Sequence, residues 1–149
     1  MRKKLSIIIL VLIISLSLCI LLLPSNKVLD SMGEYIKKEE GINVGFRDIT
    51  VYIKYFYDDV DIENNEFLKQ VTSADIASLN TYLDDFEIWV KYALDAEVNS
   101  FYDFTRVIID EQDYLCIYDK SNEDVDMEDY TIYFYDSQTK ILYYFRQTV

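Results

Sequence analysis

Apolar residues recur with two different periods along the chain, and these periods predict its first helix and its first strand. Between residues 26 and 40 they recur at three and four positions, so we expect an amphipathic helix that is capped by Ser25 or Asn26 and ends at Gly41. From Asp48 to Asp58 apolar and polar residues alternate, which is typical of a β-strand. The apolar residues of the predicted helix are Val28, Leu29, Met32, Tyr35 and Ile36.

A second, longer helix is predicted to begin after Thr72. Thr72 and Asp75 form the capping-box pattern, in which each side chain accepts a hydrogen bond from the backbone of the other residue. The apolar residues that follow keep a spacing of three and four, so we expect one side of this helix to pack on a sheet. The apolar stripe consists of Ile76, Leu79, Leu83, Phe86, Val90 and Ala93.

From residue 102 onward the pattern predicts strands. The strand-like segments are 104–110, 114–119, 129–136 and 141–149, and residues 137–140 form the loop of the last hairpin. An acidic loop joins the two strand pairs. The predicted fold is therefore α+β, with two helices packed on one face of a mainly antiparallel sheet of about five strands.

The four-residue loop of the last hairpin predicts its register. Asp136 and Ile141 flank the loop and face each other, and each residue before Asp136 faces the corresponding residue after Ile141. On one face this register places Ile132 opposite Phe145 and Phe134 opposite Tyr143, which predicts a core face. The other face is half polar, so we expect it to be open to solvent. It carries the pairs Thr131 with Arg146, Tyr133 with Tyr144, and Tyr135 with Leu142.

The tyrosines of this second face have two interpretations. Tyrosine is common on strands, where its ring packs across the strand pair while its hydroxyl stays hydrated. Alternatively, Tyr133, Tyr135 and Tyr144, together with Tyr52, form a docking patch for a partner protein, since tyrosine is enriched at interfaces.

The first 24 residues predict a membrane anchor. No charged residue occurs from Leu5 to Leu23, and at about 1.5 Å per residue this run is about 28 Å long, enough to cross a bilayer. Arg2, Lys3 and Lys4 precede the run and predict that the N-terminus stays in the cytoplasm. We therefore expect a single-pass anchor at residues 1–24 in the cell membrane, and an extracytoplasmic domain at residues 25–149.

Two alternatives for this segment stay open. A secretory signal peptide would be cleaved, although small residues do not stand at a cleavage site directly after Leu23. The segment from Leu16 to Cys19 is similar to a bacterial lipobox, in which a lipid is attached to the cysteine, but Leu18 is larger than the usual preceding residue.

The charge of the exported part excludes two classes of partner. Of the 14 basic residues three precede the anchor, so 11 basic and 27 acidic residues follow it and give a net charge of −16. Such a domain repels the phosphates of nucleic acids and an anionic lipid surface. Its single cysteine, Cys116, allows no internal disulfide and lies in an apolar strand, where we expect it in the core.

The composition also argues against an enzyme and against a bound cofactor. The chain has no histidine and only three glycines, so it lacks the residues for histidine-based catalysis, for common zinc sites and for phosphate-binding loops. Carboxylate chemistry remains, as in a hydrolase of cell-wall polymers, where two acids of different pKa suffice.

Two acidic segments are weak candidates for calcium. Acidic residues alternate in both segments as ligands do in a calcium-binding loop, but neither segment has the glycine of such a loop. Solvated loops are the simpler interpretation. The candidate residues are Asp59, Asp61 and Glu63 in the first segment, and Asp124, Asp126 and Glu128 in the second.

These observations together predict a membrane-anchored, exported module that acts by binding another envelope protein, for example as an inhibitor, an immunity-type protein or a subunit of a complex. Small-molecule substrates are not implied. The alternatives are the carboxylate-dependent hydrolase and a structural domain stabilised by calcium.

Overall fold

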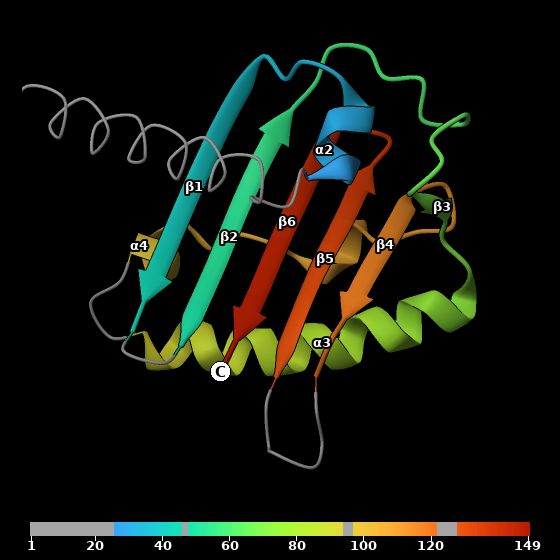
Figure 1. The fold of residues 1–149 in the computed structure, drawn as a ribbon. Coiled ribbons are helices and arrows are strands. Elements are labelled where there is room, and N and C mark those ends of the chain that lie inside the picture. The colour runs from blue at the N-terminus through green and yellow to red at the C-terminus, as the bar shows by residue number, and fades with distance from the viewer. Residues whose placement is uncertain (1–25, 46–47, 94–96, 122–127) are drawn as a thin grey trace, which may run out of the picture.

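Six antiparallel strands in the order β1-β2-β6-β5-β4-β3 form the centre of the structure, a computed structural model that describes residues 26–45, 48–93, 97–121 and 128–149 (Figure 1). Within these residues four helical segments accompany the sheet. The strands are β1 Lys37–Val44, β2 Ile49–Phe56, β3 Lys69–Gln70, β4 Tyr114–Asp119, β5 Asp129–Asp136 and β6 Ile141–Thr148. The helices are α2 Lys27–Met32, α3 Ser73–Tyr92, α4 Glu97–Phe101 and the 3-10 turn η1 Arg106–Ile108.

The predicted anchor, with its flanking Arg2, Lys3 and Lys4 and with Cys19, lies outside the described residues. Within the part of the chain that the structure describes, no helix is both long and apolar enough to cross a membrane.

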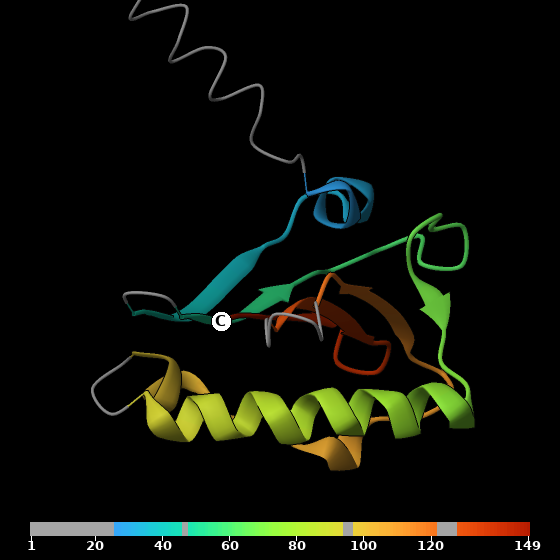
Figure 2. The ribbon, with the colours of Figure 1, turned by 60° about the horizontal axis from the view of Figure 1, so that its bottom comes forward.

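Helix α3 covers one face of the sheet, as its sequence predicts (Figure 2). Its capping box is formed: the Thr72 backbone N–H donates to Asp75 Oδ2 at 2.9 Å, and the Asp75 N–H donates to Thr72 Oγ1 at 3.3 Å. The side chain and backbone of Thr72 thereby hold the pKa of Asp75 below its usual value. Leu79, Leu83 and Phe86 are fully buried against the sheet, so the predicted stripe is confirmed as core.

The second face of the sheet is covered as well, by α2 and by the chain between β2 and β3 (Figure 2). Val28 and Met32 of α2 and Leu68 of this connection are buried against strands β2, β5 and β6. The expectation that both helices share one face is therefore wrong, because α2 and α3 lie on opposite faces. Both faces of the central strands carry large apolar side chains, so each face requires its own cover.

The first predicted helix is much shorter than expected. It ends at Met32, followed by Gly33 with a φ of 80°, a left-handed conformation that favours glycine. Residues 37–44 then form β1, with Gly41 inside the strand opposite Tyr52. Pairing with β1 satisfies the outward backbone groups of β2 along its whole length. The free energy gained by this strand pairing outweighs the local preference of residues 37–40 for a helix.

The segment 104–110 is not a strand, contrary to prediction. The ring of Phe104 packs at 5.1 Å from that of Phe145 in the core, and residues 106–108 then form η1. Arg106 pairs with Asp84 at 2.7 Å and with Glu87 at 2.9 Å, so this segment is tied to α3 and does not enter the sheet. The edge position is taken by the two-residue strand β3 instead.

The predicted register of the last hairpin is confirmed, with Ile132 opposite Phe145 and Phe134 opposite Tyr143. The expectation that its second face is open is wrong, because Tyr133 is 5% and Tyr135 3% exposed. Alternation along a strand distinguishes two faces, but it does not show whether the more polar face has a cover.

Burial on both faces leads to a stability prediction. Phe134→Ala on the α3 face and Tyr133→Ala on the α2 face should each lower the free energy of unfolding by about 3 kcal/mol or more, through lost burial and the cavity left behind. Tyr92→Ala, at a residue 73% exposed, should change it by less than about 0.5 kcal/mol. Urea unfolding of the three variants measures these values. A small effect of Tyr133→Ala would show that the α2 face is not part of the core.

Candidate functional site

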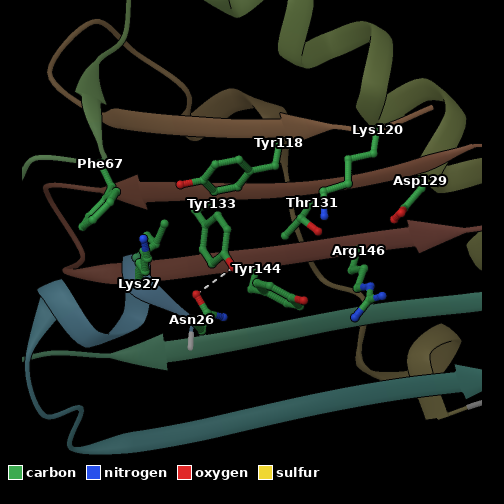
Figure 3. Close-up of a pocket in the computed structure, with 11 residues that line it drawn as sticks. Asn26, Lys27, Phe67, Tyr118, Lys120, Asp129, Thr131, Tyr133, Tyr144 and Arg146 are labelled. Carbon is green, nitrogen blue, oxygen red and sulfur yellow. Dashed lines mark hydrogen bonds between the residues drawn. The ribbon is translucent and has the colours of Figure 1, made fainter. Parts of the chain in front are cut away.

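A groove of about 540 Å³ opens on the α2 face of the sheet, between α2 and strands β4, β5 and β6 (Figure 3). Two kinds of side chain dominate its walls. Aromatic rings come from Phe67, Tyr118, Tyr133 and Tyr144, and positive charges come from Lys27, Lys120 and Arg146.

Strand register places the three tyrosines of the groove next to one another. Tyr133 of β5 lies opposite Tyr144 of β6, with ring centroids 5.1 Å apart, and the ring of Tyr118 in β4 lies 6.2 Å from that of Tyr133. The Tyr133 hydroxyl donates a hydrogen bond of 2.8 Å to Asn26 Oδ1, which also caps α2 (Figure 3). This bond therefore connects the start of α2 to the sheet at the groove. Burial raises the pKa of Tyr133.

The positive side chains of the groove have no carboxylate partner among the described residues. The ion pairs of the described residues involve Lys37, Lys38, Lys54 and Arg106, all of them elsewhere. Arg146 is half-buried, and its Nε atom is buried without a hydrogen-bond partner. An unpartnered buried donor is costly. Nε itself is shielded from solvent, so an anionic group in the groove would meet the part of the Arg146 side chain that lines it.

A second groove of about 560 Å³ lies on the α3 face, between β4 and the first half of α3. Its charged residues are Lys69, Asp75 and Asp119, and the Tyr82 hydroxyl donates to Asp119 at 2.5 Å across it. Phe67 borders both grooves, because it stands where the chain reaches the edge of the sheet.

The four tyrosines of the predicted docking patch do not form one surface. Tyr133 and Tyr144 line the α2-face groove, whereas Tyr135 is buried on the same face outside the groove lining. Tyr52 lies in the core of the opposite face, 1% exposed, with its hydroxyl donating to Asp103 at 2.8 Å. Burial raises the pKa of Tyr52, and the bond to Asp103 adds to this effect.

The sequence interpretation missed the rest of the groove. Cys116 is half-buried and packs against the core of the α2 face. Tyr118 stands two residues later in the same strand, so strand alternation alone predicts that it points to the same face. Lys27 and Lys120 stand in segments that are far apart in the chain, so no local pattern brings them together with Arg146.

Two of the calcium candidates, Asp61 and Glu128, have hydrogen-bond partners within the protein. Asn64 donates from its side-chain amide to both carboxylate oxygens of Asp61 at 3.0 Å, and Glu128 accepts a bond of 3.0 Å from Trp89 Nε1. Asp124 and Asp126 lie outside the described residues. Within the described ranges, no three acidic or cysteine side chains are grouped closely enough to hold a metal ion.

Two buried acids, Asp113 and Asp136, lie outside the linings of both grooves. Asp113 accepts the backbone N–H groups of Asp110 at 2.9 Å and Ser137 at 3.0 Å, although burial raises the pKa of its carboxyl. Asp136 accepts the N–H groups of the hairpin loop, including that of Gln138 at 2.9 Å. Both carboxylates thus organise turns.

Other acidic residues serve as hydrogen-bond acceptors for buried rings around α3. Tyr130 donates to Asp85 at 2.6 Å, and Tyr102 donates to Glu87 at 3.0 Å. Such bonds keep the polar end of a large apolar ring satisfied. Part of the strong acidity of the chain is therefore structural.

Comparison with protein-family models, with curated proteins and with solved structures gives no match for this chain. We therefore infer what the α2-face groove can bind from its geometry alone. The α2-face groove offers ring surfaces and positive charges, with Asp129 as the one acidic residue in its described lining, which suits binding of an anionic and partly apolar group.

The buried phenols predict a loss of stability at alkaline pH. Burial raises the pKa values of Tyr52, Tyr102 and Tyr130, and the hydrogen bond to Asp119, together with burial, raises the pKa of Tyr82 to about 12. Phenols of the unfolded chain ionise near their usual pKa of 10.0, so the stability that is present below this pH should be lost as the pH rises from about 10 to 12.

Urea unfolding at several pH values and phenolate absorbance of the native protein measure this linkage. Most phenols should ionise together with unfolding. Ionisation of most phenols near pH 10 with the fold intact would contradict it.

Proposed function

We propose that the chain is a single-pass membrane protein whose extracytoplasmic domain, residues 25–149, binds another protein of the cell envelope. The contact is the α2-face groove. The observation that carries this proposal is the half-buried Arg146, which lies with Lys27 and Lys120 beside three tyrosine rings and lacks a carboxylate partner among the described residues.

The charge pattern supports a specific partner chemistry. The chain has 27 acidic residues, yet the positive groups of this groove are left unpaired within the described part of it. An acidic side chain or a terminal carboxylate of the partner would complete them, with a bidentate bond to the guanidinium as the strongest contact. Tyrosine rings would supply apolar contact area, as they do at many interfaces.

The position of the groove relative to the proposed anchor favours a membrane-associated partner. Asn26 and Lys27 line the groove and follow Leu23 by three and four residues. An extended chain spans at most about 3.5 Å per residue, so four residues span at most about 15 Å. This edge of the groove therefore lies within about 15 Å of Leu23, the end of the proposed anchor. A partner that reaches this site is itself held at or near the bilayer.

The anchor has a direct test. The full-length protein should stay in the membrane fraction after alkaline carbonate washing, because the run Leu5–Leu23 spans the hydrocarbon layer. N-terminal sequencing of the purified protein provides the control. A mature N-terminus beyond Leu23 would show that the segment is cleaved and that the protein is secreted.

The groove is tested by exchange of one charge. Lys27→Glu should lower the amount of partner protein that co-purifies from detergent-solubilised membranes by about tenfold, since an attractive contact becomes a repulsive one. Lys91→Glu is the matched control, because it makes the same charge change at an exposed residue in the last turn of α3. Equal co-purification by the two variants would exclude the groove as the contact surface.

A further inference from the structure

Strand β4 is paired along only part of its outer edge. On its inner side all six residues pair with β5. On its outer side Tyr114 and Leu115 pair with β3, opposite Gln70 and Lys69, and the pairing stops there. Residues 116–119 therefore form an edge without a strand partner among the described residues.

The hydrogen-bond pattern identifies which backbone groups point outward from this edge. The Lys120 N–H donates to Asp129 O of β5 at 2.7 Å, and the Val71 N–H donates to Asp113 O on the outer side at 2.9 Å. Bonding direction alternates along an antiparallel strand, so the backbone groups of Ile117 and Asp119 point away from β5.

Just before β3 the backbone N–H groups bond to the side chain of Asn65 and not to strand β4. Continuing the register of β3 would place Phe67 opposite Ile117. The N–H groups of Phe67 and Leu68 instead donate to Asn65 Oδ1, both at 2.9 Å. Asn65 thus leaves the outward groups of Ile117 and Asp119 available for another strand.

The open edge lies between the two grooves. Tyr118 points to the α2 face and lines the groove with Lys27 and Lys120, whereas Ile117 and Asp119 line the groove on the α3 face. Successive side chains of an added strand would enter these two grooves alternately.

The first half of the opposite edge, in β1, carries four successive charged residues, whereas residues 116–119 of β4 carry one, Asp119. Strand β1 begins with Lys37, Lys38, Glu39 and Glu40, and charged residues on an edge strand discourage pairing with other chains. The outer part of β4 instead presents the half-buried Ile117 and Tyr118, which is 43% exposed.

We propose that the free edge of β4 binds an extended segment of a partner protein as an additional strand, with acidic side chains toward the α2 face and basic side chains toward the α3 face. The acidic side chains meet Lys27 and Lys120 in a groove whose one acidic lining residue is Asp129, and the basic ones meet Asp75 and Asp119 in a groove whose one basic lining residue is Lys69. A second copy of the chain is disfavoured by its own net charge of −13. The inference rests on the proposed function in taking the partner to be a protein and in using Lys27 and Lys120 of the same groove.

The test uses the full-length protein in detergent micelles and two octapeptides of the same composition. In the first, the unit Glu-Lys-Val-Ile is repeated, so that an extended chain carries its acids on one face and its bases on the other. In the second, Glu and Lys are exchanged in the second unit, which mixes the charges on both faces. We expect the first peptide to bind about tenfold more tightly than the second.

Two substitutions of Ile117 distinguish the contribution of its backbone N–H to peptide binding from that of its side chain. Ile117→Pro removes the outward N–H and leaves the bonds between β4 and β5 intact, so binding of the first peptide should weaken by about tenfold. Ile117→Ala removes a similar amount of packing but keeps the N–H, so it should weaken binding clearly less than Ile117→Pro does, and equal loss in both variants would contradict pairing through the backbone. Thermal melts of both variants verify that they are folded.

Amide hydrogen exchange of the wild type gives a readout that needs no variant. The N–H groups of Ile117 and Asp119 should become protected when the first peptide is added, while the already bonded N–H groups of Cys116 and Tyr118 stay unchanged. Absence of binding, equal binding of both peptides or protection elsewhere would overturn the proposal. Protection that depends on protein concentration without peptide would assign the edge to a second copy and overturn it too.

This result is independent of the groove experiment. Lys27→Glu tests capture of the natural partner, whereas Ile117→Pro tests the edge with a defined peptide. Either proposal can therefore fail without the other.

Discussion

The need to cover both faces of the central strands is the constraint on which the rest of this structure depends. Strand β2 has Tyr52 in the core of the α3 face and Val51 and Ile53 in the core of the α2 face, and β5 and β6 are divided in the same way. Burial of such side chains is the main favourable contribution to folding. A sheet with one open face would forfeit a large part of it. Helix α3 covers one face, while α2 and the chain from β2 to β3 cover the other.

This constraint explains which parts of the fold the sequence could predict. Helix α3 and strands β2, β5 and β6 have a clear period and strong end signals, such as the capping box at Thr72 and the four-residue hairpin loop. Their positions and the register of the last hairpin are therefore confirmed. The short helix α2 and strand β1 were merged into one predicted helix, because the apolar spacing continues to Ile36 and the glycine at 41 looks like a stop. Pairing with β2 determines the outcome there, and pairing is a tertiary effect.

The candidate binding surface is harder to predict, for a physical reason. Strand alternation correctly assigned Tyr133 and Tyr144 to one face, but it could not show that α2 would cover part of that face and leave a groove beside itself. The charges of the groove come from the start of α2, the end of β4 and the middle of β6, so only the folded chain brings them together. The open edge of β4 was hidden likewise, since it arises where Asn65 diverts the chain from the sheet.

Acidity has two roles in this architecture. Around α3, carboxylates accept hydrogen bonds from the polar ends of aromatic rings, as in the pair Tyr130 and Asp85, and this allows large rings to be buried at the margin of a small core. Elsewhere carboxylates pair with lysines, as Glu39 and Asp103 do with Lys54 at 2.9 and 2.6 Å. Against this background the positive groups of the α2-face groove, which have no carboxylate partner among the described residues, form the surface to which we assign the proposed contact.

Equilibrium unfolding in urea, followed by one probe on each face of the sheet, tests the central claim most directly. Trp89, the single tryptophan, reports on the α3 face through its fluorescence, and the NMR signals of Tyr133 report on the α2 face. If cover on both faces is required, the two signals will change with the same midpoint and the same slope, as expected for one cooperative unit. Loss of the Tyr133 signal at a lower urea concentration, with Trp89 unchanged, would show that the sheet is stable with its α2 face open and would contradict the account.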